Sequence, residues 1–188
     1  MLSSSIAPMT DLNPQLLLPT TYLALILVLL CGAGWFVFRE VVKTRKVENT
    51  ISRLQAKLSK EKGTAQEYYE LGGIFLDKRL FSQAIGQFQK ALKAPDLPEA
   101  ESPAIYNALG YAYFAQDQYD TAIRQYKEAL KVNPDYVTAL NNLGHAYERK
   151  QLTVQAIETY EHVLKAEPNN STAKRRVESL KKRVVTPA

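Results

Sequence analysis

An internal repeat constrains this chain more than any other feature of its sequence. The dipeptide Leu-Gly occurs three times, and similar residue types surround each copy. Twelve residues after each glycine stands an alanine, and four residues later stands an aromatic. The three copies begin at Leu71, Leu109 and Leu143; the alanines are Ala84, Ala122 and Ala156; the aromatics are Phe88, Tyr126 and Tyr160. Repetition at such an interval predicts stacked helical units, none of which can bury its apolar face alone.

These residues and their spacing resemble tetratricopeptide repeats (TPR), in which each unit of about 34 residues is a helical hairpin. Pro134 and Pro168 close the second and third units. The glycine and alanine let the two helices of a hairpin cross closely, while the aromatics and leucines fill the space between neighbours. We therefore predict three TPR units, at residues 65–98, 103–136 and 137–170.

Two segments depart from the regular repeat. Residues 171–184 combine many lysines and arginines with an apolar stripe, which is typical of a solubilising capping helix; the stripe is Ala173, Val177, Leu180 and Val184. The first two Leu-Gly pairs are 38 residues apart rather than 34, and we assign the surplus to residues 99–102 of a proline-rich, acidic connection. This insertion is either a tolerated loop or an additional contact edge.

A 19-residue run without charge, residues 20–38, follows an N-terminal tail at residues 1–19. As a helix the run would be about 28 Å long, close to the ~30 Å hydrocarbon core of a bilayer. The alternative, a cleaved signal peptide, needs a basic segment before the run, and the tail has no Lys or Arg. We predict one transmembrane helix, and the basic residues after it place the C-terminal part in the cytosol or its equivalent.

Residues 39–63 form a basic stalk between the anchor and the repeats, and we expect it to be helical. Val47, Ile51, Leu54 and Leu58 are spaced by four, three and four residues, as in a heptad seam. Two heptads are too few to fix a coiled-coil dimer. We therefore expect this stripe to rest on the lipid or on the next domain, with dimerisation as the alternative.

Composition excludes several classes of function. A lone Cys31 cannot form an internal disulfide or a cysteine-based zinc site, and the two histidines have no metal-ligand spacing. P-loop, dinucleotide-binding and nucleophile-elbow motifs are absent from the sequence. We predict no enzymatic activity, no metal or other cofactor, and no small-molecule substrate. The basic cluster of the capping helix has no interleaved aromatic residue, so we also predict no nucleic-acid binding.

The TPR resemblance implies a concave groove, built mainly from the first helix of each unit, that holds an extended peptide or a partner helix. Eight of the eleven tyrosines fall on or next to packing positions, Tyr22 lies in the membrane run, and two remain for the groove. The candidate groove residues are Tyr69, Asn107, Tyr111, Asn141, Asn142, His145 and Arg149. Asparagine amides can donate to and accept from a peptide backbone at once. The charges of the clamp in chaperone-tail TPR adaptors are missing, which argues against that class.

The order of anchor, basic stalk and three repeats, with Lys-Gly-Thr-Ala-Gln-Glu-Tyr at residues 62–68, resembles one particular family. The chain is similar to the small thylakoid TPR proteins that assist photosystem I assembly in cyanobacteria and plastids. This resemblance implies an all-α assembly factor, anchored in the thylakoid membrane with its repeats on the cytoplasmic or stromal side. Its partners would be photosystem I subunits or assembly intermediates and other assembly factors, and it would touch lipid through residues 20–38. A membrane-tethered TPR adaptor for another complex is the alternative.

Overall fold

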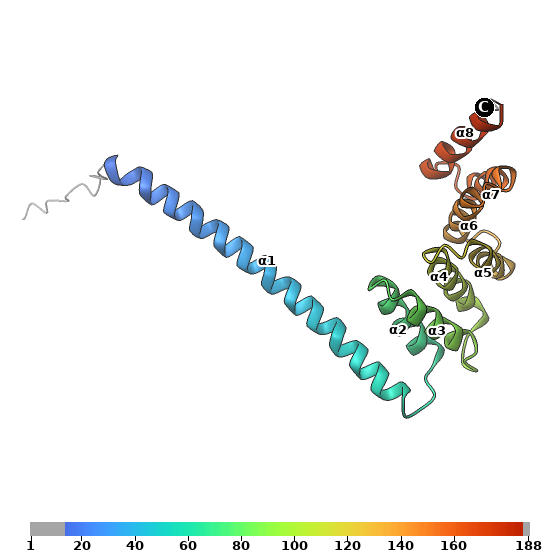
Figure 1. Cartoon of the computed structure of the whole chain (residues 1–188), viewed down its shortest axis with the longest axis horizontal. Coiled ribbons are helices and arrows are strands. Elements are labelled where there is room, and N and C mark those ends of the chain that lie inside the picture. Colours follow the sequence, from blue (N-terminus) through green and yellow to red (C-terminus); the bar gives the residue numbers. More distant parts are fainter. Residues whose placement is uncertain (1–13, 186–188) are drawn as a thin grey trace, which may run out of the picture. The chain divides into compact units, whose positions relative to one another are not determined.

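A computed structural model describes the backbone of residues 14–185 and the side chains of residues 19–183, so residues 1–13 and the side chain of Val184 lie outside the described part. Every element in the described part is helical (Figure 1). The chain divides into two compact units, Met1–Thr50 and Ile51–Ala188. The helices are α1 (Pro14–Leu58), α2 (Ala65–Asp77), α3 (Phe81–Leu92), η1 (Glu99–Glu101), α4 (Ser102–Phe114), α5 (Tyr119–Val132), α6 (Val137–Arg149), α7 (Thr153–Ala166) and α8 (Ser171–Val185).

The predicted anchor and most of the predicted stalk form one helix, α1, which begins before the apolar run and contains Pro19. Its most apolar window has a mean hydropathy of 2.2 and is 0% buried. Apolar side chains that no protein surface covers are stable when lipid covers them. The helix is therefore long and apolar enough to cross a membrane.

The prediction of a helical stalk up to residue 63 was wrong in its last five residues, because α1 ends at Leu58. The chain turns there, with the Glu61 amide donating to the Lys57 carbonyl at 3.0 Å. The Leu58 side chain occupies the space that a Cβ atom on Gly63 would fill, and the Gly63 amide donates to the Tyr68 hydroxyl at 3.1 Å. These contacts require the chain to fold back before the first repeat.

The three predicted repeats are confirmed as the hairpins α2–α3, α4–α5 and α6–α7. In each hairpin the predicted aromatic of the second helix lies directly over the glycine of the first. A Cβ atom added to Gly72, Gly110 or Gly144 would lie 2.6, 2.6 or 2.8 Å from the ring of Phe88, Tyr126 or Tyr160. All three rings are at most 2% exposed. The glycines therefore set how closely the two helices of each hairpin approach.

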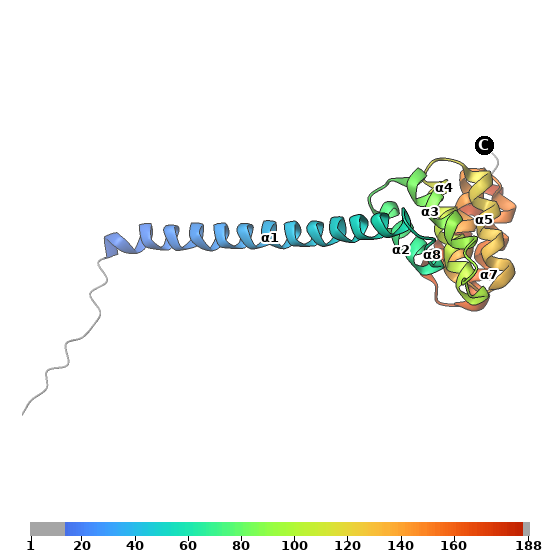
Figure 2. The same cartoon turned by 90° about the horizontal axis from the view of Figure 1, so that it is seen from below.

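Successive hairpins stack into a solenoid that ends at α8, as the two views show (Figures 1 and 2). The predicted capping helix is confirmed: Ala173, Val177 and Leu180 are buried in one core cluster with residues of α5, α6 and α7. The Asn170 side chain begins α8 by accepting from the Ala173 amide at 3.0 Å.

Burial of the eight tyrosines expected in the core is confirmed for three, Tyr126, Tyr147 and Tyr160. It was wrong for the other five, which are half-buried: Tyr68, Tyr106, Tyr113, Tyr119 and Tyr136. A tyrosine at the edge of a hairpin can pack its ring while its hydroxyl reaches a polar partner. Tyr113, for example, accepts from the Gln89 amide at 3.0 Å.

The C-terminal part of the stalk stripe belongs to the second compact unit, Ile51–Ala188. Leu54 is 0% and Ile51 8% exposed, so this part of the stripe belongs to the core of the repeat domain rather than to a lipid surface. Lys57 also forms an ion pair with Glu67 of α2 at 2.5 Å. Residues 51–58 thus cap the first repeat, as α8 caps the last.

The predicted insertion folds as η1 together with Ser102, the first residue of α4. The Ser102 hydroxyl donates to the Glu99 carbonyl at 2.8 Å. Just before η1, both carboxylate oxygens of Asp96 accept from the Ala65 amide, at 3.1 and 3.3 Å. An acidic side chain there satisfies a free amide at the start of α2 and complements the helix dipole. The connection between the first two repeats is therefore an ordered part of the fold.

We expect Gly110→Ala to destabilise the repeat domain. The added Cβ would meet the buried Tyr126 ring at 2.6 Å. Overpacking of this kind costs about 1–3 kcal/mol and outweighs the ~1 kcal/mol that alanine gains in helix propensity. The matched control is Gly73→Ala, where nothing lies within 4 Å and stability should rise by up to about 1 kcal/mol. Thermal unfolding followed by circular dichroism measures both, and equal midpoints would contradict the role of the glycine–ring contact.

A second prediction concerns the stalk. Leu54→Ala should lower the stability of the repeat domain by about 2–5 kcal/mol, because it removes a fully buried side chain. The control is Gln55→Ala, since Gln55 is exposed on the same helix. Thermal unfolding of the full chain in detergent compares the two. Equal unfolding midpoints for Leu54→Ala and the unmodified chain would show that residues 51–58 are not part of the domain.

Candidate partner-binding groove

The first helices of the repeats form the inner row of the solenoid. Neighbouring first helices, α2 with α4 and α4 with α6, contact each other more extensively than neighbouring second helices do. A stack that is tighter along one row curves toward that row, so α2, α4 and α6 line the concave side. Helical periodicity places Tyr69, Asn107 and Asn141 at one level of this side, and Tyr111 and His145 one turn further along.

The three predicted asparagines lie together, but the chain itself already uses part of their hydrogen-bonding capacity. The side-chain amide of Asn142 donates to the side-chain Oδ1 atom of Asn107 at 2.9 Å and so joins α6 to α4. The side-chain Nδ2 atom of Asn141 donates to the backbone carbonyl of Val137 at 3.1 Å within α6. The Asn141 Oδ1 atom is buried and has no hydrogen-bond partner within the described part of the chain. It is therefore a buried acceptor whose hydrogen-bonding capacity the described residues leave unused.

The two predicted tyrosines differ in accessibility. Tyr69 is half-buried, and its ring lies 5.9 Å from that of Phe88, between centroids. Burial raises the pKa of the Tyr69 hydroxyl, and the phenol of Tyr136 adds to this effect, so Tyr69 stays protonated at neutral pH. Tyr111 is 47% exposed and lines a cavity of about 390 Å³ together with Leu76, Asp77, Arg79, Phe81 and Ala115. Tyr111 can therefore offer a partner both an aromatic face and a hydroxyl.

Arg149 is held in place by residues that sequence reasoning did not assign to the groove. Its guanidinium lies over the rings of Tyr119, at 4.8 Å, and Phe114, at 6.0 Å, and its Nη2 atom is 3.4 Å from Asp117. The Tyr119 hydroxyl donates to the same Asp117. Arg149 therefore already has a counterion, and it can present only its remaining donors to a partner. The sequence signal was weak because Asp117 lies in a turn and Tyr119 was assigned to packing.

His145 lies beside this cluster, with its ring 4.9 Å from that of Phe114. Burial lowers the pKa of His145, while Glu148 opposes this change and Arg176 and Arg149 add to it. The imidazole is therefore neutral at physiological pH and can donate or accept. Glu148 is half-buried and occupied by the chain, accepting from the Tyr160 hydroxyl at 2.8 Å and from Arg176 at 3.5 Å.

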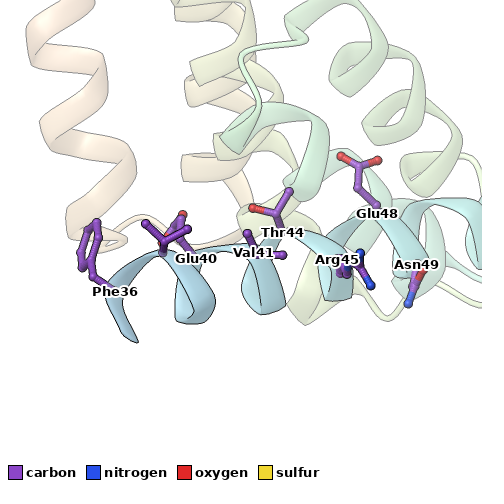
Figure 3. Close-up of a pocket in the computed structure, with 8 residues that line it drawn as sticks. Phe36, Glu40, Val41, Thr44, Arg45, Glu48 and Asn49 are labelled. Carbon is purple, nitrogen blue, oxygen red and sulfur yellow. The ribbon is translucent and has the colours of Figure 1, made fainter. Parts of the chain in front are cut away.

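A second hollow, of about 450 Å³, runs along one face of α1 (Figure 3). Its residues come from a single helix, so it is an open surface feature rather than an enclosed site; they are Phe36, Val37, Glu40, Val41, Thr44, Arg45, Glu48 and Asn49. The change from apolar to charged side chains along it matches the passage from a membrane core to its interface. Within the described residues, no three His, Cys, Asp or Glu side chains gather as metal ligands would.

Comparison with known families and proteins agrees with this architecture. The tetratricopeptide repeat family matches residues 69–123 and 137–170, and a TPR repeat family matches residues 110–151. A protein of Guillardia theta named ycf37, itself uncharacterized, is 33% identical over 67% of this chain and 71% of its own length. The ycf37 protein of Cyanophora paradoxa is 40% identical over 57% of this chain. The chloroplastic TPR domain-containing protein PYG7 of Arabidopsis thaliana is 36% identical over 68% of this chain.

The chain spans 62% of the Cyanophora relative and 42% of the Arabidopsis relative. Two solved structures are similar in fold. The crystal structure of MamA has a TM-score of 0.68 and 23% identity, over 76% of this chain and 83% of that one. The first TPR domain of Spaghetti (RPAP3), solved with an HSP90 peptide, has a TM-score of 0.61 and 23% identity, over 67% and 97%. At identities this low, the similarity concerns the fold alone.

Proposed function

The chain belongs to the ycf37 family of tetratricopeptide-repeat proteins, and we propose that it is a membrane-anchored, non-enzymatic scaffold that assists photosystem I assembly or stability. In this proposal its concave groove binds photosystem I subunits or assembly intermediates, and other assembly factors act with it. The observation that carries the proposal is the groove itself. It exposes Tyr111, and it contains the buried Asn141 Oδ1 atom, which has no hydrogen-bond partner among the described residues. The same chain has an apolar helix of membrane-spanning length.

The membrane assignment rests on three observations. α1 has an apolar window that is 0% buried by the described part of the chain, basic residues follow that window directly, and one relative is a chloroplastic protein. We propose that the thylakoid is the membrane and that the repeats lie on its cytoplasmic or stromal side. Interaction with photosystem I is favoured over a tethered adaptor for another complex by the resemblance of the basic stalk and first repeat to the thylakoid assembly factors.

Partner capture tests the groove. Membranes from cells actively making photosystem I are solubilised mildly, and the tagged chain is recovered with its partners. We expect photosystem I subunits in the recovered material, and Tyr111→Ala should reduce their yield about tenfold, because central exposed aromatics carry much of an interface's binding energy. Tyr111 is 47% exposed, so its removal should leave the fold intact.

The matched control for capture is Val154→Ala, which shortens an apolar side chain 60% exposed on α7, outside the groove. This variant should recover the same proteins as the unmodified chain. Recovery of a different membrane complex, with no photosystem I subunit, would contradict the assembly role and leave the adaptor function. Equal capture by Tyr111→Ala and the unmodified chain would show that the partner contacts a surface outside the groove.

Orientation has its own test. In a Cys31→Ser background, Ser179→Cys places one thiol on an exposed position of α8. A membrane-impermeant maleimide should label it in intact thylakoids only from the cytoplasmic or stromal side. Labelling confined to the lumenal side would reverse the proposed topology. Labelling of the same variant after detergent solubilisation shows that the thiol is reactive.

A further inference from the structure

The insertion between the first two repeats builds one wall of a separate cavity. This cavity, of about 320 Å³, is lined by Ala65, Gln66 and Tyr69 of α2, Ala100 and Glu101 of η1, and Ala104 and Ile105 of α4. It lies beside the N-terminal turns of α2 and α4, and therefore at the end of the groove where these helices begin. The connection between α5 and α6 comprises only residues 133–136 and has no helical segment to form such a wall. The cavity is therefore a local consequence of the four extra residues.

The cavity is small and mainly apolar. Ala65 and Ile105 are each 3% exposed, and the half-buried Tyr69 ring also packs against the ring of Phe88. Three alanines leave the space that longer side chains would fill. The volume is at the lower end of the range for small-molecule sites, which begins near 300 Å³. It suits one large apolar side chain of a partner better than a cofactor.

The rim of the cavity is acidic. Asp96, Glu99 and Glu101 are the acidic residues of the connection between α3 and α4, and all three are exposed; its one basic residue, Lys93, directly follows α3. Asp96 is engaged by the Ala65 amide. Across the described part of the chain, neither Glu99 nor Glu101 has an ion-pair partner, and Glu101 itself lines the cavity. A basic group beside the bound apolar side chain would meet uncompensated negative charge here.

We propose that this cavity is a specificity pocket for a partner segment in which a large apolar residue is flanked by lysine or arginine. The inference rests on the proposed scaffold function and extends it, because it assigns one end of the groove to a defined chemistry. Tyr69 forms the aromatic wall of the pocket, and Glu101 attracts the flanking cation. Tyr111, one repeat further along, contributes to affinity outside the pocket.

Synthetic peptides test the pocket directly. Three fluorescent peptides of about nine residues share a Ser/Gly framework and differ only at the centre, which is Lys-Leu-Lys, Lys-Ser-Lys or Glu-Leu-Glu. Binding to the full chain in phosphatidylcholine nanodiscs is followed by fluorescence anisotropy. We expect the Lys-Leu-Lys peptide to bind about tenfold more tightly than either of the others. Its affinity should fall with added salt.

Two variants and one control complete the design. Ala100→Phe fills the cavity from an exposed position, and Glu101→Lys reverses the rim charge; each should remove the preference for Lys-Leu-Lys. Glu158→Lys makes the same charge change at an exposed position of α7 and should keep the preference. Equal binding of the three peptides, or an unchanged preference in Ala100→Phe and Glu101→Lys, would contradict the proposal that this cavity is a specificity pocket.

Different experimental outcomes would contradict the proposed pocket and the proposed scaffold function. If photosystem I subunits are captured and Tyr111→Ala loses them, while the peptides do not discriminate, the scaffold function stands and the pocket is wrong. If the peptides discriminate as expected but no photosystem I subunit is captured, the pocket stands as a recognition site and the assembly role is wrong.

Discussion

The fold depends on one contact that occurs three times, the packing of an aromatic ring onto a glycine where the two helices of a hairpin cross. Each ring reaches within 2.8 Å of where a Cβ atom would stand, so these positions tolerate no side chain without a shift of the ring. The ring fills the space inside the hairpin and is itself buried. Because the contact recurs with the sequence repeat, it gives the three hairpins a common geometry, and a common geometry lets them stack.

A stack of this kind has two ends, and both would expose apolar surface. The chain covers the C-terminal end with α8, whose buried face is Ala173, Val177 and Leu180. It brings the last turns of the stalk, Ile51 and Leu54, into the core of the same unit as the first repeat. The stalk therefore serves two purposes. Its final turns stabilise the repeat domain, and the preceding residues connect that domain to an apolar helix of membrane-spanning length.

The concave side combines groups that the chain has already paired with groups that remain available. The Asn107–Asn142 hydrogen bond and the stacking of Arg149 on two rings rigidify the inner row. Tyr111 is exposed, and the buried Asn141 Oδ1 atom has no hydrogen-bond partner among the described residues. A preorganised surface with a few open contacts loses little conformational entropy when a partner binds, which suits transient holding of an assembly intermediate.

The sequence by itself determined the three hairpins, the capping helix and the apolar helix, because each has a residue period or a length that one structure satisfies. It also brought most groove candidates to one side, since helical periodicity fixes which residues share a face. It could not foresee that Asn107 and Asn142 bond to each other, that Tyr119 stacks on Arg149, or that η1 walls a cavity against Tyr69. These contacts join residues more than 25 positions apart, and only tertiary packing sets such distances. Local patterns place a residue on a face, whereas the stacking of repeats decides what it meets there.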